Sequence, residues 1–188
     1  MSDFIEQNRE ALEADVIVIA DSGNVKIGVP TITTSLRGLA DAIIEVDQPM
    51  RPVHSGMGGG IVPDAFMVLS KIIASFHNEK GDLMIEGLTP TDMKVAELDK
   101  SYTQKMLGSE EINLFDTDSI SKRLWLEPAL DVLAIDAPSI EDAVNLVIPK
   151  ARAKISLRLP PTEDPEHAMK MLEEHVMKNI PWNASVKF

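Results

Sequence analysis

Apolar and polar positions follow two periods along the chain, and these predict strands and helices. Residues 36–46 include Ala42, Ile44 and Val46, which alternate with Ile43, Glu45 and Asp47, and this is typical of an antiparallel strand with one face in a core. From residue 65 to 76 the apolar positions recur at spacings of three, four and seven, which predicts a helix of about four turns. Pro63 and Asp64 are suitable residues to begin that helix.

The same reading predicts the rest of a compact α+β fold. We expect strands at 83–85, 130–135, 151–159 and 184–188, and a helix from Asp164 to Asn179 with Pro165 at its first position. Residues 89–124 are polar and irregular, with two weak helical patches, and we interpret them as an insertion. The main elements from residue 36 onward then follow the ferredoxin-like plan, in which two helices cover one face of a four-stranded antiparallel sheet.

The first 20 residues follow a different pattern. Residues 3–13 are typical of a short polar helix, and residues 15–20 are apolar at every position after the first, which predicts a strand buried on both faces. No second strand of this kind, with its crossover helix, follows in the sequence. Asp21 comes directly after this strand, and the carboxyl end of a parallel strand is where α/β enzymes place reactive side chains.

Composition and charge exclude several classes of function. The 188 residues are 44% hydrophobic and 26% charged, as expected of a globular protein with one good core or two small ones. The net charge of -12 argues against nucleic-acid and anionic membrane partners. The absence of cysteine excludes disulfides and thiolate metal sites, and is compatible with the cytoplasmic location that we expect. No segment has the pattern of a signal peptide or a membrane span.

The residues that could carry chemistry each allow two interpretations. Asp21 is either a turn residue that satisfies local backbone donors or an oxygen ligand for a divalent metal, but one carboxylate cannot hold zinc. The four histidines show no paired metal-ligand spacing. His54 precedes a glycine-rich stretch at 56–60, which is either a tight turn or a place where backbone amides approach a ligand. Arg158, considered together with Asn145, is either solvated on its strand or clamps a substrate carboxylate.

The order of these residues resembles that of a known enzyme family. The shared features are Asp21 after an apolar strand, Gly28-Val29-Pro30 with Leu36-Arg37-Gly38, His54-Ser55-Gly56 with Gly59-Gly60, Gly81 before a strand, Trp125 with Pro128, and Asn145 ahead of Arg158. Together they resemble the carnosinase-like dipeptidases, which are dizinc metallopeptidases related to succinyl-diaminopimelate desuccinylase and aminoacylase. The resemblance implies that residues 1–30 are the trailing edge of a catalytic domain and residues 31–188 a lid or dimerisation domain.

The resemblance also implies roles for individual residues. Asp21 matches a carboxylate that binds one of two zinc ions. His54 matches a lid histidine that crosses a dimer into the neighbouring active site and stabilises the tetrahedral oxyanion. Asn145 and Arg158 match lid residues that bind the substrate backbone and its terminal carboxylate, although some relatives have threonine at the position of Asn145.

The other ligands of such a centre are missing. The family's His-x-Asp segment, its Glu-Glu pair and its last histidine ligand should lie before residue 1 and after residue 188. We therefore expect the isolated chain to bind no zinc and to be inactive, and its parent to be a homodimer that hydrolyses a dipeptide or an N-acyl amino acid with two zinc ions. The alternative is a freestanding ferredoxin-like module that binds a ligand or a protein without catalysis. A homodimer is expected in either case, because an open sheet leaves unpaired edges.

Overall fold

The computed structural model describes residues 2–18, 23–24 and 27–188, which fall into two compact units, residues 1–34 and 35–188. The first unit contains α1 (Ser2–Gln7) and the 3-10 helix η1 (Glu10–Leu12), where the sequence predicts a short helix. The strand predicted at 15–20 is wrong over residues 15–18, where Val16, Ile17 and Val18 are 77%, 75% and 85% exposed, and its last two residues lie outside the described ones. A strand that is apolar on both faces needs neighbours to bury it, and none of the described strands pairs with this segment.

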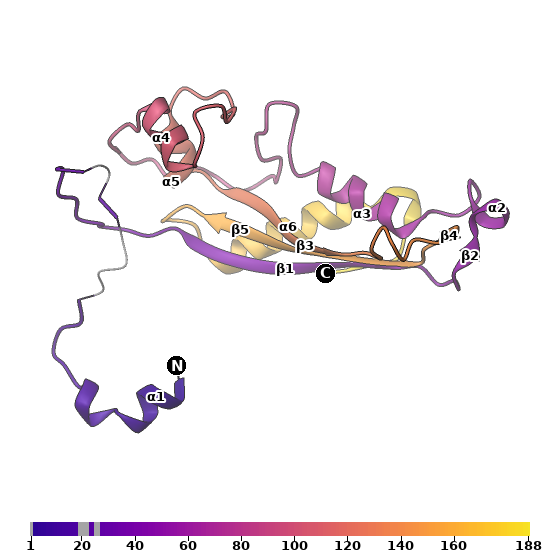
Figure 1. The fold of residues 1–188 in the computed structure, drawn as a ribbon, viewed down its shortest axis with the longest axis horizontal. Helices are drawn as coiled ribbons and strands as arrows, with labels where there is room; N and C mark the ends of the chain where they lie inside the picture. Colours follow the sequence, from indigo (N-terminus) through magenta and orange to yellow (C-terminus); the bar gives the residue numbers. More distant parts are fainter. Residues whose placement is uncertain (1, 19–22, 25–26) are drawn as a thin grey trace. The chain divides into compact units, whose positions relative to one another are not determined.

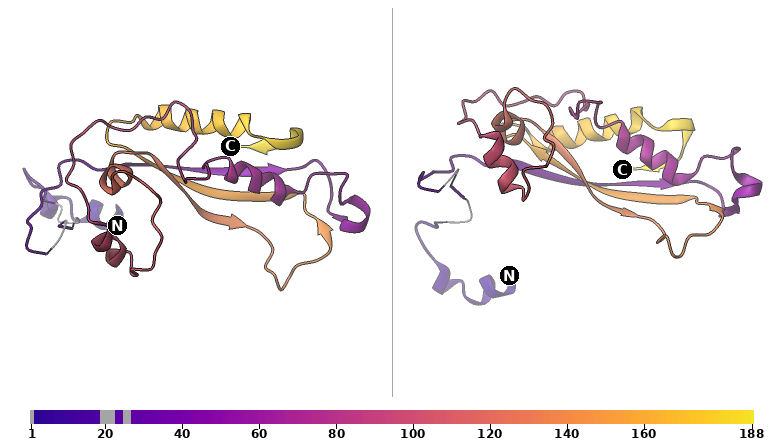
Figure 2. Two further views of the ribbon diagram at one scale, coloured as in Figure 1. Left: turned by 90° about the horizontal axis from the view of Figure 1, so that it is seen from above. Right: turned by 45° about the horizontal axis from the view of Figure 1, so that its top comes forward.

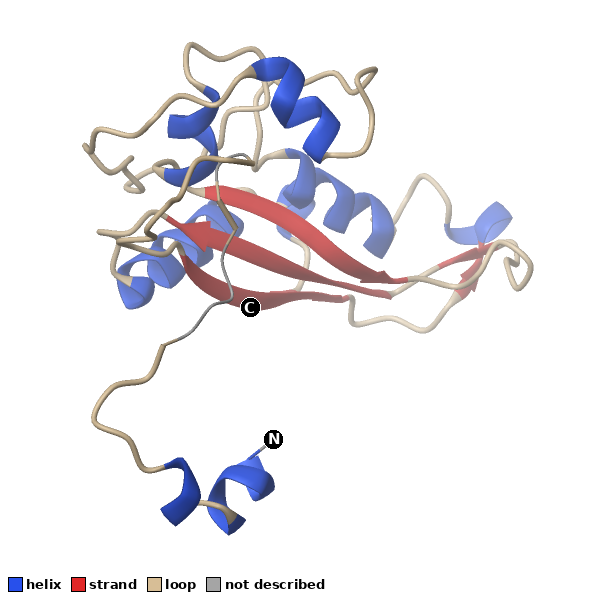
Figure 3. Cartoon of the chain, turned by 60° about the vertical axis from the view of Figure 1, so that its left-hand side comes forward, coloured by secondary structure: helices blue, strands red, loops and turns tan. Residues whose placement is uncertain are grey.

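The second unit is built on a four-stranded sheet. Its strands are β1 (Gly38–Asp47), β3 (Ala129–Asp136), β5 (Lys150–Leu159) and β6 (Val186–Lys187), arranged in the order β3-β5-β1-β6 with every neighbouring pair antiparallel. β1 and β5 pair along their whole length, from Gly38 opposite Leu159 to Asp47 opposite Lys150. Figure 3 shows the long strands side by side. This order confirms the predicted ferredoxin-like sheet.

Two helices cover one face of this sheet, α3 (Ala65–Ala74) and α6 (Pro165–Lys178) (Figure 2). The predicted starting residues cap them: the Asp64 carboxylate accepts hydrogen bonds from the backbone N–H groups of Phe66 and Met67, and Asp164 accepts one from His167. The core between sheet and helices contains, among others, Ile44, Val46, Val68, Leu69, Ile72, Phe76, Ile155, Leu157, Leu172 and Val176. Alternate residues of β1 and β5 thus supply one side of the core, as the two-residue period predicts.

The two ends of the sheet carry different structures (Figure 1). At one end lies the insertion, with α4 (Lys100–Met106) and α5 (Ile120–Trp125), which are the two helical patches predicted within 89–124. At the other end, β2 (Val53–His54) pairs with β4 (Leu146–Val147), and α2 (Ser55–Gly58) follows β2 directly. This second pair of strands is not predicted by the sequence pattern.

Two details differ from the expected strands. The strand predicted at 83–85 is wrong, because only one isolated bridge forms there, between His77 and Leu83. The last strand is shorter than predicted: of residues 184–188, β6 contains Val186 and Lys187, and the 3-10 helix η2 (Pro181–Asn183) comes before this range. Within the described ranges, no helix has the length and apolar character needed to cross a bilayer.

Candidate functional site at the two ends of the sheet

His54 ends β2 and caps the short helix α2. Its Nδ1 accepts a hydrogen bond of 3.0 Å from the backbone N–H of Gly56. Because a backbone N–H can only donate, Nδ1 is the unprotonated nitrogen of the neutral ring, and the ring proton lies on Nε2. The side chain is exposed, so Nε2–H is a hydrogen-bond donor available to a group outside the chain's own fold.

Asn145 lies beside His54 because β2 and β4 pair. Val53 is opposite Val147, and His54 is opposite Leu146. One residue further along, the carbonyl oxygen of Asn145 accepts a hydrogen bond of 2.9 Å from the backbone N–H of Ser55. The structure therefore brings together two of the four candidate residues, although about 90 residues separate them in the sequence.

The glycines after His54 allow close packing of α2 on the β2–β4 pair. A Cβ atom at Gly58 would lie 2.4 Å from Cγ2 of Val53, and Gly60 has a φ of +82°, which favours glycine. Gly58 is also buried. Of the two interpretations of this stretch, the tight turn is the one that fits these contacts.

Arg158 lies at the opposite end of the sheet. On β5 it pairs with Leu39 of β1 and Ala129 of β3, and its side chain is exposed. No hydrogen bond or ion pair joins its guanidinium to any side chain among residues 2–18, 23–24 and 27–188. Burial lowers the pKa of nearby Arg37 below its ordinary value, and the positive charge of Arg158 lowers it further. Hydrogen bonds with Ser156 and Lys154, and more weakly the positive charge of Arg158, lower the pKa of Asp41. Because no described side chain forms an ion pair with the Arg158 guanidinium, this group is suited to bind a carboxylate.

The register of the sheet fixes how far apart these groups lie. Between Arg158 and Lys150 the strand β5 advances about 27 Å, at about 3.4 Å per residue. Lys150 is opposite Asp47, and the β2–β4 pair with His54 lies beyond that end (Figure 1). An extended dipeptide spans about 7 Å. His54 and Arg158 of one chain therefore cannot contact the same dipeptide.

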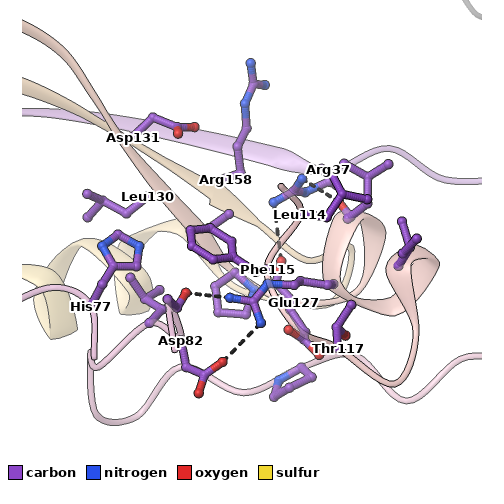
Figure 4. Close-up of a pocket in the computed structure, with 18 of the residues that line it drawn as sticks. Arg37, His77, Asp82, Leu114, Phe115, Thr117, Glu127, Leu130, Asp131 and Arg158 are labelled. Carbon is purple, nitrogen blue, oxygen red and sulfur yellow. Dashed lines mark hydrogen bonds and ion pairs between the residues drawn. The ribbon is translucent and has the colours of Figure 1, made fainter. Parts of the chain in front are cut away.

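A cavity of about 560 Å³ lies beside Arg158, between the insertion and the start of β3. Its lining is mostly apolar, and Figure 4 shows Phe115, Leu130 and Asp82 among the residues around it. Asp82 forms an ion pair of 3.0 Å with Arg123, which also lines the cavity. Sequence reasoning missed this cavity. The signal that could have found it is the group of apolar residues in an otherwise polar insertion, such as Met106, Leu107 and Leu114.

The described residues do not fit a metal site on their own. Over the described ranges there is no group of three or more histidine, aspartate or glutamate side chains that could hold an ion. Asp21, the expected zinc ligand, lies outside those ranges.

Comparison with known proteins identifies the family. Residues 34–184 match the family model of the M20 peptidase dimerisation domain. The cysteinylglycine-S-conjugate dipeptidase of Corynebacterium striatum is 38% identical over 189 residues, which cover 98% of this chain and 41% of that enzyme. The Cys-Gly metallodipeptidase DUG1 of Saccharomyces cerevisiae is 26% identical over 172 residues, which cover 86% of this chain and 36% of that enzyme.

Solved structures agree in fold. Human carnosine dipeptidase 1 aligns over 100% of this chain and 44% of its own, with a TM-score of 0.73 and 22% identity. The M20 family metallo-carboxypeptidase from Sulfolobus solfataricus aligns over 100% of this chain and 51% of its own, with a TM-score of 0.72 and 24% identity. The chain spans about two fifths of the length of the curated dipeptidases that it matches. It belongs to the family of M20 peptidase dimerisation domains.

Proposed function

We propose that this chain is the lid and dimerisation domain of a two-zinc dipeptidase, hereafter the parent enzyme. The names of its curated relatives point to Cys-Gly and its S-conjugates as substrates, within the wider class of dipeptides and N-acyl amino acids. The relatives are more than twice as long as the matched segment, which leaves room for a catalytic domain. The parent is cytoplasmic and has neither nucleic acid nor membrane as partner.

The exposed N-terminal segment supports a larger parent. Val16, Ile17 and Val18 are consecutive apolar residues that are each at least 75% exposed. Such a run is unfavourable in water, and it fits a segment that the rest of a larger enzyme covers. A freestanding module leaves this run unexplained.

The observation that carries the proposal is the separation of His54 from Arg158. If both groups act on one dipeptide, they must come from two copies of the chain, since about 27 Å of β5 alone lies between them. A homodimer with composite active sites meets this requirement. Each site would take Arg158 from one subunit and His54, with its neighbour Asn145, from the other.

The outer edge of β3 offers a surface for that dimer. Val132, Leu133 and Ile135 are exposed by 37%, 55% and 51%, and none of the described strands pairs with the outer side of β3. Ala129, at the start of β3, pairs with Arg158, whereas Asp136, at its end, pairs with Arg152 at the His54 end of the sheet. Two copies of β3 paired antiparallel about a two-fold axis would therefore bring the His54 end of one subunit beside the Arg158 end of the other.

Each residue of such a site would have a separate role. The planar guanidinium of Arg158 would hold the substrate's terminal carboxylate by two parallel hydrogen bonds. The Nε2–H of His54 would donate to the oxygen of the scissile carbonyl as negative charge develops on it. The two zinc ions belong to the parent, with Asp21 as one ligand, and they supply activated water when bound.

Subunit complementation tests this arrangement. In the parent enzyme, His54→Asn and Asp21→Asn should each abolish most activity when expressed alone. Co-expressed with two different affinity tags, the two variants should form a heterodimer in which one active site keeps both an intact Asp21 and an intact His54. The doubly tagged dimer should then recover up to about half of the wild-type rate, because one of its two sites is complete.

A second heterodimer serves as the control for this experiment. A heterodimer of wild type with the double variant His54→Asn, Asp21→Asn should be inactive, because every site in it lacks one of the two groups. Recovery in that control, or no recovery in the complementing pair, would place His54 and Asp21 in the same subunit's site and refute the composite arrangement. A wild-type parent that cleaves no dipeptide would refute the proposed function as a whole.

A further inference from the structure

The cavity beside Arg158 has a mostly apolar lining, and the Arg158 guanidinium forms no hydrogen bond or ion pair with the side chains that the structure describes. The terminal nitrogens of the other two arginines that line it donate hydrogen bonds within the chain, whereas Nε of Arg37 is buried without a partner among the described residues. Arg37 donates from Nη1 to the carbonyl oxygen of Leu124 at 2.5 Å and from Nη2 to that of Glu127 at 3.3 Å. Arg123 donates to the Asp82 carboxylate at 3.0 Å and to the carbonyl of Gly81 at 2.5 Å. Of the three arginines around the cavity, Arg158 is therefore the exposed one whose guanidinium has no partner among the side chains of the described ranges.

The wall opposite the sheet comes from the insertion and exposes apolar side chains. Met106, Leu107 and Phe115 line the cavity and are exposed by 58%, 53% and 63%. Apolar side chains gathered around a cavity are typical of a small-molecule site, in which a few polar groups fix orientation. The lining also contains polar side chains, among them Glu127 and Asp131. Figure 4 shows the Arg158 side chain extending away from Phe115 and His77, which places its guanidinium at the rim.

The bonds that hold the insertion keep this wall in place. The two hydrogen bonds of Arg37 tie the end of α5 to the start of β1, and the Arg123 guanidinium also lies 4.9 Å from the centre of the Phe115 ring. At the other side, a Cβ atom on Gly81 would lie 2.4 Å from that ring. The cavity is thus a formed feature of the lid with a defined place for Phe115.

We propose that this cavity binds the side chain of the substrate's C-terminal residue, so that the parent enzyme cleaves dipeptides with a large apolar C-terminal residue as well as those that end in glycine. The inference rests on the proposed function, in which Arg158 binds the terminal carboxylate. The C-terminal side chain is attached to the carbon that also carries this carboxylate, and it is therefore the substituent nearest to the rim. A substituent on the sulfur of an N-terminal cysteine lies further from the carboxylate.

The experiment compares three substrates in the full-length parent enzyme: Cys-Gly, Cys-Leu and S-benzyl-Cys-Gly. Met106→Trp places a large ring in the cavity and should lower the ratio of kcat/KM for Cys-Leu to that for Cys-Gly by about tenfold or more, since apolar side-chain pockets discriminate on this scale. Met93→Trp is the matched control: Met93 also lies in the insertion and is 41% exposed, but it is not part of the cavity lining. It should leave the ratio unchanged.

Each outcome bears on one of the two proposals. A Met106→Trp enzyme that discriminates between Cys-Leu and Cys-Gly like the wild type would overturn the cavity assignment, and so would an effect confined to S-benzyl-Cys-Gly. If the Met106→Trp enzyme unfolds at a lower temperature than the wild type, Leu107→Trp repeats the test from the neighbouring position. Failure of the wild type to cleave any of the three substrates refutes the proposed function, which separates that failure from failure of the cavity assignment.

Discussion

Nδ1 of His54 accepts a hydrogen bond of 3.0 Å from the backbone N–H of Gly56, two residues further along the chain. This contact gives one side chain two roles. It satisfies a donor at the start of α2, and it fixes the ring proton on the outward nitrogen, Nε2. The two roles can be separated, because asparagine is also a good residue at the start of a helix but has no imidazole.

The pair His54→Ala and His54→Asn should therefore behave differently. His54→Ala removes the cap and should lower the free energy of unfolding of the chain by about 1 kcal/mol, whereas His54→Asn should keep most of it. Both should lower kcat of the parent enzyme by about 10² to 10³, the usual cost of losing an oxyanion donor. Urea unfolding and steady-state kinetics measure the two effects.

Wild-type turnover in His54→Asn would remove the proposed role of the imidazole. Equal destabilisation by both substitutions would instead show that asparagine does not replace the bond to Gly56. The free energy of unfolding and kcat are measured independently. The capping role of His54 can therefore be refuted without affecting its proposed catalytic role, and the catalytic role without affecting the capping role.

Gly58 is the second residue that controls the position of His54. A methyl group at Gly58 would lie 2.4 Å from Cγ2 of Val53, the residue directly before His54. We expect Gly58→Ala to lower the free energy of unfolding by about 1 to 3 kcal/mol, the usual cost of overpacking, and to reduce turnover of the parent enzyme.

The double variant Gly58→Ala, Val53→Ala tests the cause. Removing Cγ2 of Val53 makes room for the new methyl group, so the double variant should be more stable than the sum of the two single effects. Strict additivity, measured by urea unfolding of all four chains, would mean that the contact between residues 53 and 58 is not the source of the destabilisation.

Most of the fold was predictable because its signals are local. The buried positions of β1 and α3 recur with the periods of a strand and a helix, and Asp64 and Asp164 are side-chain caps that can be recognised from the sequence. The strand order then followed from the sequence of elements, since few topologies place two helices on one face of a four-stranded sheet.

The remaining elements depend on contacts between distant residues. β2 and β4 have two residues each, too few for a period, and they exist because Val53 meets Val147 across more than 90 residues. Residues 15–18 are the opposite case: they have the composition of a buried strand, but no described strand pairs with them and they form no strand. In both cases pairing decides the structure, and pairing is not encoded in the local pattern.

The candidate site was also predictable only in part, because its residues can be recognised from the sequence but the distances between them cannot. His54, Asn145 and Arg158 were each singled out from the sequence, but the distance between them follows from the register of β1 against β5, which no local signal specifies. The roles of Asp21, His54, Asn145 and Arg158 stay predictions.

Arg158 and Arg152 form a natural pair for testing the carboxylate anchor. Both lie on β5 and point to the same, helix-free face, but Arg152 forms an ion pair with Asp136, whereas Arg158 has no such partner among the described side chains. Arg158→Met should lower kcat/KM of the parent enzyme for a dipeptide by about 10- to 100-fold, because hydrogen bonds to a charged group are lost. Arg152→Met should change it less than about twofold, since exposed ion pairs contribute little.

A substrate whose carboxylate is amidated sharpens this test. It should be cleaved poorly by the wild type and lose no further activity on Arg158→Met. Similar losses for the acid and the amide would show that Arg158 acts in some way other than by binding the carboxylate.

His175 makes the stability of the chain depend on pH. Its Nε2 lies 3.0 Å from Oγ of Ser75, and its ring stacks on Phe76 with the centroids 5.3 Å apart. Burial of the ring, the largest cause, lowers the pKa of His175 below its ordinary value of 6.5. Burial likewise lowers the pKa of His77. Near pH 6.5 and below, the unfolded chain therefore binds more protons than the folded one, and stability must fall as the pH falls.

We accordingly expect the urea midpoint of the chain to be highest above pH 6.5 and to decrease between pH 7.5 and 5.5. His175→Gln should make this decrease smaller, and the double variant with His77→Gln smaller still, because neither glutamine takes up a proton. Unfolding curves of the three chains at both pH values provide the measurement. A midpoint that rises on acidification, or a slope that the two substitutions leave unchanged, would show that these rings are not the groups that titrate between the folded and unfolded states.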